Sequence, residues 1–158
     1  MTFQRVRGLE LVFYADAAFA PKETKRKSVA GGAVICWGAA IQSISRTQKC
    51  TTFSSREAEY VANADGLKEA LFLRSVWRFF SPNFRGPYIQ VFGDNNGAIE
   101  VAVNPTRHHF LREHVENGVF EISHVQSKNQ HAEFDFLTKP LAKDASLFHR
   151  NFIRNMRR

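Results

Sequence analysis

The stretch SVAGGAVICWGAAIQSIS (28–45), followed by SSREAEYVANADGLKEALFLRSVWRFF (54–80), decides the fold. The first part contains two apolar runs of strand length on either side of a short Gly-Ala connection, a pattern typical of an antiparallel hairpin. The second part opens on two serines that can cap a helix, and it continues mostly with good helix formers. We therefore predict two paired strands that lead into one long helix.

The predicted helix carries an apolar stripe at helical spacing. The stripe comprises Val61, Ala64, Leu67 and Leu71, and it is widened by Ala62, Leu73 and Trp77. Because such a stripe is stabilised by removal from water, we expect the helix to pack across a sheet.

Apolar runs separated by turn residues continue through the rest of the chain. The expected elements are strands 9–16, 28–37 and 40–45, helix 54–80, strand 88–93, helices 96–104 and 107–117, strand 119–125 and helix 145–156. This order of strands and helices, βββαβααβα, belongs to the mixed α/β class. The chain has 158 residues, 44% of them hydrophobic, with no repeat or linker, so we expect a single domain over residues 1–158.

The charge and the cysteines limit the class of protein. A net charge of +7 favours attraction to a polyanion such as nucleic acid, with ordinary surface charge as the alternative. Residues 1–10 contain no continuous apolar segment, and no stretch approaches the length of a membrane span, so we expect an intracellular protein, cytoplasmic or nuclear. Cys36 and Cys50 lack CxxC spacing and are predicted to be reduced and partly buried.

Three acidic residues stand where the predicted elements begin or end. Asp16 ends the first strand, Glu59 lies in the first turns of the long helix, and Asp94 ends the fourth strand. A fourth acid, Asp135, follows the polar loop QSKNQHAE (126–133). Carboxylates at the ends of several elements can converge on a divalent cation. The layout suggests a metal-dependent phosphodiesterase.

Each of these acids also has a simpler explanation. Asp16 could be a turn residue, and Glu57 competes with Glu59 because acids in the first turns of a helix complement its dipole. The chemistry still favours a cluster of carboxylates, because two hard cations roughly 4 Å apart can activate the water and stabilise the leaving oxygen of a phosphodiester. Hard cations prefer oxygen ligands, which carboxylates supply.

Five motifs in a fixed order resemble the ribonuclease H domain of copia-type retrotransposon polyproteins. They are YADAAFA (14–20), the stretch 24–62 that ends in SSREAEYVA, DNNGAI (94–99), HHFLREHVENGVFEISHV (108–125) and DFLTKPL (135–141). The resemblance extends from about Gly8 to about Met156. It implies a five-stranded mixed sheet, three antiparallel strands followed by two parallel ones, flanked by helices. It also implies two Mg²⁺ or Mn²⁺ ions and hydrolysis of RNA paired to DNA.

The resemblance assigns roles by position. It implies that Asp16, Glu59, Asp94 and Asp135 form the catalytic and metal-binding set, with Glu59 preferred to Glu57 because it precedes Tyr-Val-Ala as the family acid does. The implied substrate is an RNA/DNA hybrid. The implied partner is a reverse transcriptase domain of the same polyprotein, and we expect a monomer.

Several residues near the expected metal site could contact nucleic acid. They are Lys25, Arg26, Lys27, Arg46, Lys49 and Asn95. The alternative is that the cations are solvated and that Asn95 is a turn residue. Contacts to phosphate would make binding sensitive to salt without reading the base sequence.

Three departures from the family pattern lead to an alternative function. The segment after Pro105 is shorter than in relatives, Glu133-Phe134 is inserted before Asp135, and Arg56 replaces a Thr. An insertion of this length moves an acid by several ångströms, which metal geometry does not tolerate. The alternative is a catalytically degraded RNase H-like domain that binds hybrid or double-stranded nucleic acid without cleaving it.

Overall fold

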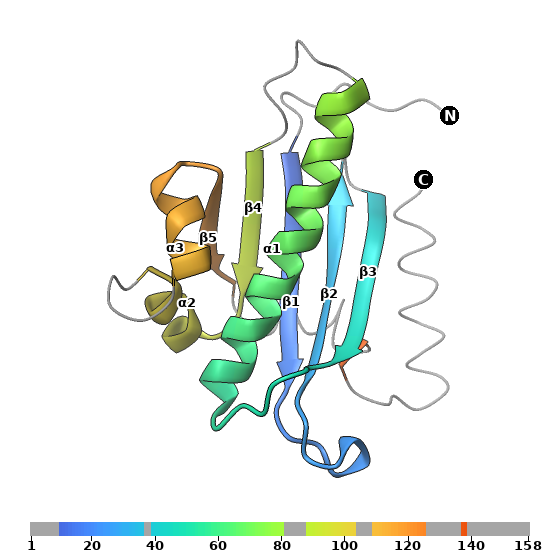
Figure 1. The fold of residues 1–158 in the computed structure, drawn as a ribbon, viewed down its shortest axis with the longest axis vertical. Helices are drawn as coiled ribbons and strands as arrows, with labels where there is room; N and C mark the ends of the chain where they lie inside the picture. The colour runs from blue at the N-terminus through green and yellow to red at the C-terminus, as the bar shows by residue number, and fades with distance from the viewer. Residues whose placement is uncertain (1–9, 37–38, 81–87, 104–108, 126–136, 139–158) are drawn as a thin grey trace.

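The computed structural model describes residues 10–36, 39–80, 88–103, 109–125 and 137–138 (Figure 1). In chain order the elements are β1 (Glu10–Ala18), the 3-10 helix η1 (Lys22–Thr24), β2 (Val29–Cys36), β3 (Ala39–Thr47), α1 (Ser55–Phe80), β4 (Tyr88–Gly93), α2 (Asn96–Val103), α3 (His109–Glu116) and β5 (Phe120–His124). Each strand and helix predicted up to residue 125 is present, with ends shifted by at most two residues. The predicted helix 145–156 lies outside the described residues.

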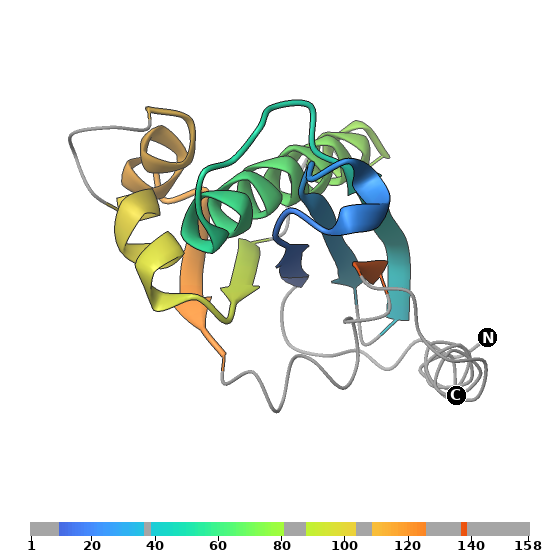
Figure 2. The same ribbon diagram turned by 90° about the horizontal axis from the view of Figure 1, so that it is seen from below.

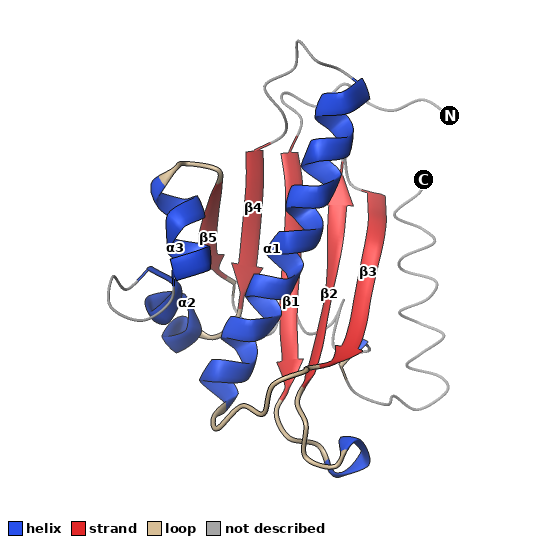
Figure 3. Cartoon of the chain, in the orientation of Figure 1, coloured by secondary structure: helices blue, strands red, loops and turns tan. Residues whose placement is uncertain are grey.

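The strands form one five-stranded sheet in the order β3-β2-β1-β4-β5 (Figure 3). The pairs β1–β2 and β2–β3 are antiparallel, whereas β1–β4 and β4–β5 are parallel. Parallel neighbours need a crossover connection, and α1 precedes β4 while α2 and α3 precede β5. The predicted fold class, three antiparallel strands followed by two parallel strands with flanking helices, is confirmed.

The main core lies between the sheet and α1, which crosses the sheet diagonally (Figure 1). On β1, the alternate residues Leu11, Phe13 and Ala15 are buried in this core. Val12 and Tyr14 belong to a smaller cluster. This division follows from the alternation of side chains along a strand, which sends neighbouring residues to opposite faces.

The start of α1 is fixed by a reciprocal cap. The backbone N–H of Glu57 donates to Ser54 Oγ at 3.1 Å, and the backbone N–H of Phe53 donates to Glu57 Oε2 at 2.7 Å. Such a cap satisfies N–H groups that the first turn of a helix leaves without partners. The helix cap predicted for the serine pair is confirmed at Ser54, and Glu57 completes it.

The buried face of α1 is lined by small side chains. A Cβ at Gly66 would overlap the ring of Phe13, so the helix approaches β1 closely only because Gly66 has no side chain. The predicted stripe is therefore only partly right, because Leu67 is fully buried but Val61, Ala64 and Leu71 are partly buried at the edge of the core. The other buried apolar positions are Ala58, Tyr60, Ala62, Gly66 and Ala70. Among the described helices, none is apolar enough over a sufficient length to cross a membrane.

The two cysteines are free thiols in different environments. Cys36 is buried at the end of β2, and burial raises the pKa of its thiol. Cys50 is exposed, because β3 ends at Thr47 and Cys50 lies in the connection to α1. The prediction of partial burial is wrong for Cys50.

We expect the folded chain to react rapidly with a thiol reagent at Cys50 and slowly at Cys36. The thiolate is the reactive form, and burial suppresses both its formation and its access to reagent. Stopped-flow labelling of the native protein should show one fast thiol, lost in Cys50→Ser and kept in Cys36→Ser. Two fast thiols in the native wild type would contradict the burial of Cys36.

Candidate active site

The sheet places three of the four predicted acids at one of its ends. Asp16 lies near the carboxyl end of β1, and Asp94 directly follows β4, which runs parallel to β1. The same end holds the start of α1, which carries Glu59 in its first turns (Figures 1 and 2). The carboxyl ends of parallel strands meet at one edge of a sheet, which explains the arrangement. Asp135 lies outside the described residues.

Asp16 and Glu59 are buried carboxylates near the end of β1, where Glu59 contacts the backbone next to Asp16. Their exposed fractions are 3% and 6%. The backbone N–H of Ala17 donates to Glu59 Oε1 at 3.1 Å, across 42 positions of sequence. A buried carboxylate is costly unless its oxygens are hydrogen-bonded or bind a cation. This contact ties the first turns of α1 to the end of β1 that carries Asp16.

The pairing of β1 with β4 ends two residues before Asp16 and Asp94. β1 and β4 pair at Tyr14 and Phe92, whose rings stack with a centroid distance of 5.3 Å. Asp16 follows Tyr14 by two residues on β1, and Asp94 follows Phe92 by two residues, directly after the end of β4 at Gly93. Both acids therefore lie just past the last paired residues of two neighbouring parallel strands, at the same end of the sheet.

The turn that contains Asp94 is fixed by the end of β5. His124 Nε2 lies 3.1 Å from the carbonyl oxygen of Asp94, and since a carbonyl only accepts, Nε2 donates in this contact. The backbone N–H of Val125 donates to the carbonyl of Gly93 at 3.0 Å. Sequence reasoning gave His124 no specific role, because its contact depends on the pairing of β4 with β5.

Thr138 contacts Asp16 from the far end of the sequence. Its hydroxyl Oγ1 donates to Asp16 Oδ2 across 122 positions, and only 6% of the residue is exposed. Figure 2 shows the segment 137–138, in red-orange, against the face of the sheet opposite α1. The motif DFLTKPL contains Thr138, but sequence reasoning assigned it no role because nothing in the spacing indicates a buried hydroxyl.

The three described acids supply the oxygen donors that Mg²⁺ or Mn²⁺ prefers. Within the part of the chain that the structure describes, no group of three or more His, Cys, Asp or Glu side chains has the geometry of a metal site. The donor chemistry of Asp16, Glu59 and Asp94 thus fits a hard cation, but these residues do not form a complete ligand set by themselves.

Four of the predicted nucleic-acid contacts are exposed cations. Lys25, Arg26 and Lys27 follow η1 in the connection between β1 and β2, and Lys49 follows β3. Figure 1 shows the η1 turn and the end of β3 at the same end of the sheet as the start of α1. Their charges are therefore exposed at the end of the sheet where α1 begins.

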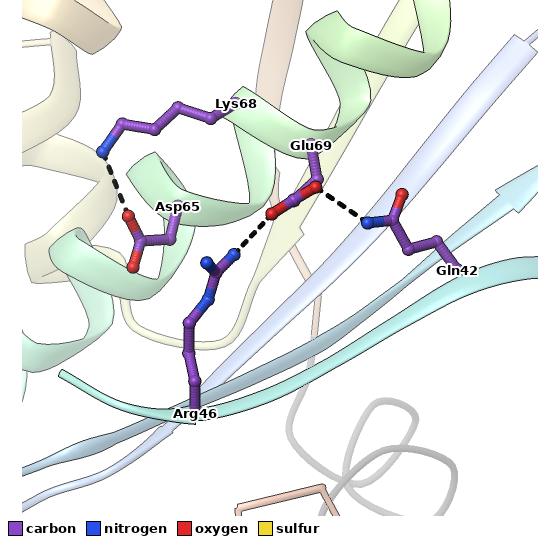
Figure 4. Close-up of polar contacts among 5 residues, drawn as sticks. All are labelled: Gln42, Arg46, Asp65, Lys68 and Glu69. Carbon is purple, nitrogen blue, oxygen red and sulfur yellow. Dashed lines mark hydrogen bonds and ion pairs between the residues drawn. The ribbon is translucent and has the colours of Figure 1, made fainter.

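Arg46 and Asn95 have partners within the protein. Arg46 Nη2 lies 2.7 Å from Glu69 Oε1, and Gln42 Nε2 donates to Glu69 Oε2 at 2.8 Å, so one carboxylate links β3 to α1 (Figure 4). Asn95 Oδ1 accepts from the backbone N–H of Ala98 at 3.1 Å and caps α2. These contacts give both residues structural roles, and their contact with nucleic acid stays a prediction.

The sequence is similar to segments of plant transposon polyproteins. It is 31% identical over 147 residues to the retrovirus-related Pol polyproteins from transposons RE1 and RE2 of Arabidopsis thaliana, and these matches cover 87% of the chain. It is 28% identical over 141 residues to the Pol polyprotein from transposon TNT 1-94 of Nicotiana tabacum, over 83% of the chain. The match covers 10% of each polyprotein, so the chain spans about a tenth of the length of these relatives. No protein-family model matches the chain.

Solved structures of ribonucleases H share the fold. LC11-RNase H1, isolated from compost by a metagenomic approach, superimposes with a TM-score of 0.54 at 18% identity, over 87% of this chain and 98% of that one. The same enzyme in complex with an RNA/DNA hybrid gives a TM-score of 0.53 at 16% identity, over 87% and 99% of the two chains. The N-terminal RNase H domain of rv2228c from Mycobacterium tuberculosis gives 0.54 at 15% identity, over 90% and 97%.

At these identities the structural likeness establishes the fold, while the sequence matches establish the relationship to transposon polyproteins. Together they confirm the resemblance found in the motifs. The chain is an RNase H-like domain related to the Pol polyproteins of copia-type retrotransposons.

Proposed function

We propose that the chain is a two-metal-dependent endoribonuclease that cleaves the RNA strand of RNA/DNA hybrids, acting as one domain over residues 1–158. The observation that carries the proposal is the hydrogen bond from Ala17 N–H to Glu59 Oε1, which holds one buried carboxylate at the strand end that bears a second, Asp16. Asp94 follows the neighbouring parallel strand at the same end. Acids that come together from separate elements can hold the metal ions that promote hydrolysis of a phosphodiester.

The acids would hold Mg²⁺ or Mn²⁺ against the phosphate to be cleaved. When bound, two such ions would supply an activated water and stabilise the charge that develops on the leaving oxygen. We propose Asp16 as the ligand shared by the two ions, with Glu59 and Asp94 on the side of the attacking water. Because Asp16 and Glu59 are buried, water screens their charges weakly, which strengthens their attraction for a cation.

Asp135 is the proposed fourth acid. It precedes Thr138 by three positions, and the hydroxyl of Thr138 donates to Asp16. Three residues of chain span at most about 11 Å in any conformation. The contact of Thr138 with Asp16 therefore supports a place for Asp135 in the same set, where it would help to hold the second ion.

A panel of substrates tests the proposed activity. The chain would be incubated with an RNA/DNA hybrid labelled on either strand, with duplex RNA and with duplex DNA, in Mg²⁺, in Mn²⁺ and in EDTA. We expect cleavage of the RNA strand of the hybrid alone, in either metal and not in EDTA. Cleavage of duplex DNA, or cleavage that persists in EDTA, would contradict the proposal.

A second candidate function is binding of hybrid or double-stranded nucleic acid without cleavage. One observation favours it, the insertion of Glu133-Phe134 before Asp135 relative to the family pattern. A domain of this kind would keep its exposed cations and its salt-sensitive affinity. It would leave both strands of a hybrid intact in Mg²⁺ and in Mn²⁺.

We expect the loop after η1 to carry part of the affinity for nucleic acid. The double variant Lys25→Gln/Arg26→Gln should weaken hybrid binding, and the slope of log Kd against log salt concentration should fall by about 2, because each lost phosphate contact removes about 0.9. Lys68→Gln/Arg78→Gln is the matched control, since it removes the same charge from exposed positions of α1. Equal salt slopes for the two double variants would show that hybrid affinity depends on the net charge of the protein and not on the loop after η1.

The polyprotein relatives support a further part of the proposal. They are about ten times as long as the matched segment. We propose that the activity serves beside a reverse transcriptase domain of the same polyprotein, which would generate the RNA/DNA hybrid that this domain cleaves.

A further inference from the structure

The absence of a side chain at Gly31 leaves space for Thr138 to contact Asp16. Gly31 pairs with Asp16 in the β1–β2 register. A Cβ at Gly31 would lie 2.5 Å from Thr138 Cγ2 and 3.0 Å from Leu137 Cβ, closer than packed atoms approach one another. The segment 137–138 thus lies directly over the backbone of Gly31, and any side chain there would push the Thr138 hydroxyl away from the carboxylate.

The neighbouring residue, Leu137, is held at two further points. Ser45 Oγ on β3 donates to the carbonyl oxygen of Leu137, and the Leu137 side chain packs against Ala33 and Ile35 on β2. The segment therefore contacts β1, β2 and β3 together. The Thr138 hydroxyl contacts Asp16 from a fixed position, because the neighbouring Leu137 is held by both a hydrogen bond and apolar contacts.

We propose that Thr138 is a positioning residue that orients the carboxylate of Asp16 for cation binding. The inference rests on the proposed function, in which Asp16 is the shared ligand. A hydroxyl bound to Oδ2 restricts rotation of the carboxylate group, yet each carboxylate oxygen has two acceptor positions, so Oδ2 can hold this hydrogen bond and a cation together. Hydrogen-bond partners of metal ligands act in this way in other metal sites, and their loss reduces metal affinity or activity about 10- to 100-fold.

The test compares Thr138→Val with Thr138→Ser. Valine keeps the shape of threonine and removes the hydroxyl, whereas serine keeps the hydroxyl and removes the methyl group. We expect Thr138→Val to weaken Mn²⁺ binding, measured by titration calorimetry, by about 10-fold or more, and to slow hybrid cleavage by a similar factor at unchanged hybrid Kd. Thr138→Ser should restore both values to within about threefold of wild type, well inside that 10-fold range.

Equal Mn²⁺ affinity in Thr138→Val and wild type would overturn the inference, as would equal losses in the valine and serine variants. The calorimetric readout separates the inference from the proposed function. A wild type that binds Mn²⁺ but leaves the hybrid intact would refute the nuclease, and the comparison of valine with serine would still decide the role of Thr138.

Gly31→Ala provides a second route if Thr138→Val does not fold. This variant keeps both Thr138 and Asp16 but is expected to displace the hydroxyl, because the added Cβ would lie only 2.5 Å from Thr138 Cγ2. We expect a loss of Mn²⁺ affinity comparable to that of the valine variant. Wild-type affinity in a folded Gly31→Ala protein would count against the inference.

Discussion

Replacing Asp16 with Asn is expected to slow cleavage of the RNA strand by about 10³-fold or more. The variant keeps the shape of the side chain and an oxygen that can accept from Thr138, but it removes the charge that would attract the cation. Loss of a metal-held charge at the reacting phosphate costs several kcal/mol of transition-state stabilisation, and each 1.4 kcal/mol is about tenfold in rate. Single-turnover cleavage of a labelled hybrid measures this loss, while anisotropy checks that the hybrid still binds.

Asp65→Asn is the matched control, because it makes the same chemical change on the same domain. Asp65 lies partly buried on α1 and pairs with the exposed Lys68 at 3.0 Å, in a contact at the protein surface (Figure 4). Such surface pairs contribute about 0–1 kcal/mol to stability, so the cleavage rate should stay within about twofold of wild type. A rate for Asp16→Asn within tenfold of wild type, or an equal loss in Asp65→Asn, would exclude Asp16 as the shared ligand.

Replacing Gly66 with Ala is expected to lower the free energy of unfolding by about 2 kcal/mol. Alanine favours a helix over glycine by about 1 kcal/mol, so the substitution would stabilise an exposed helix. At Gly66 the added Cβ would overlap the ring of Phe13, which is 1% exposed and packed in the main core. Overpacking of this kind costs about 1–3 kcal/mol or more. Thermal unfolding should show a midpoint lowered by about 4–8 °C for a chain of this size.

Gly97→Ala is the control for helix propensity. An added Cβ there would meet Nε of Arg56 at 2.5 Å, and the end of that exposed side chain can swing aside. We expect this variant to be as stable as wild type or more stable. In the double variant Gly66→Ala/Phe13→Leu, the smaller side chain should relieve part of the overlap, so the combined loss should be smaller than the sum of the single losses. A Gly66→Ala protein as stable as wild type would contradict the close packing of α1 on β1.

The order of strands and helices was predictable because each element carries its own local signals. The serines at 54–55 and Glu57 mark the start of α1 in the sequence, and the structure shows Ser54 and Glu57 in a reciprocal cap. The apolar runs around the Gly-Ala connection predict β2 and β3, which pair antiparallel. Such signals depend on residues a few positions apart, which is the range over which sequence patterns are informative.

The packing of α1 was less predictable, because it depends on a partner far away in the sequence. Hydrophobic spacing favoured Val61 and Leu71 as core residues, yet these are only partly buried. The closest contact is made at Gly66, where the ring of Phe13 fills the space that a side chain would otherwise occupy. A glycine in a helix indicates a close approach only once the facing residue is known.

The candidate site was also predictable only in part from the sequence. The positions of Asp16, Glu59 and Asp94 at the ends of elements could be read from the sequence, because strand and helix ends have local signals. The contacts of Ala17 with Glu59 and of Thr138 with Asp16 could not be read, since they join residues 42 and 122 positions apart. The sequence likewise misjudged Cys50, whose exposure depends on where β3 ends.

Addition of Mg²⁺ to a preformed complex decides between a nuclease and a binding domain. The wild-type chain would be bound at low salt, without divalent metal, to a hybrid whose strands carry different labels, and binding would be verified by anisotropy. We predict that Mg²⁺ then starts cleavage of the RNA strand and leaves the DNA strand intact. A complex that stays bound while both strands remain whole, in Mg²⁺ and in Mn²⁺, would contradict the assignment of the acids as a catalytic metal site.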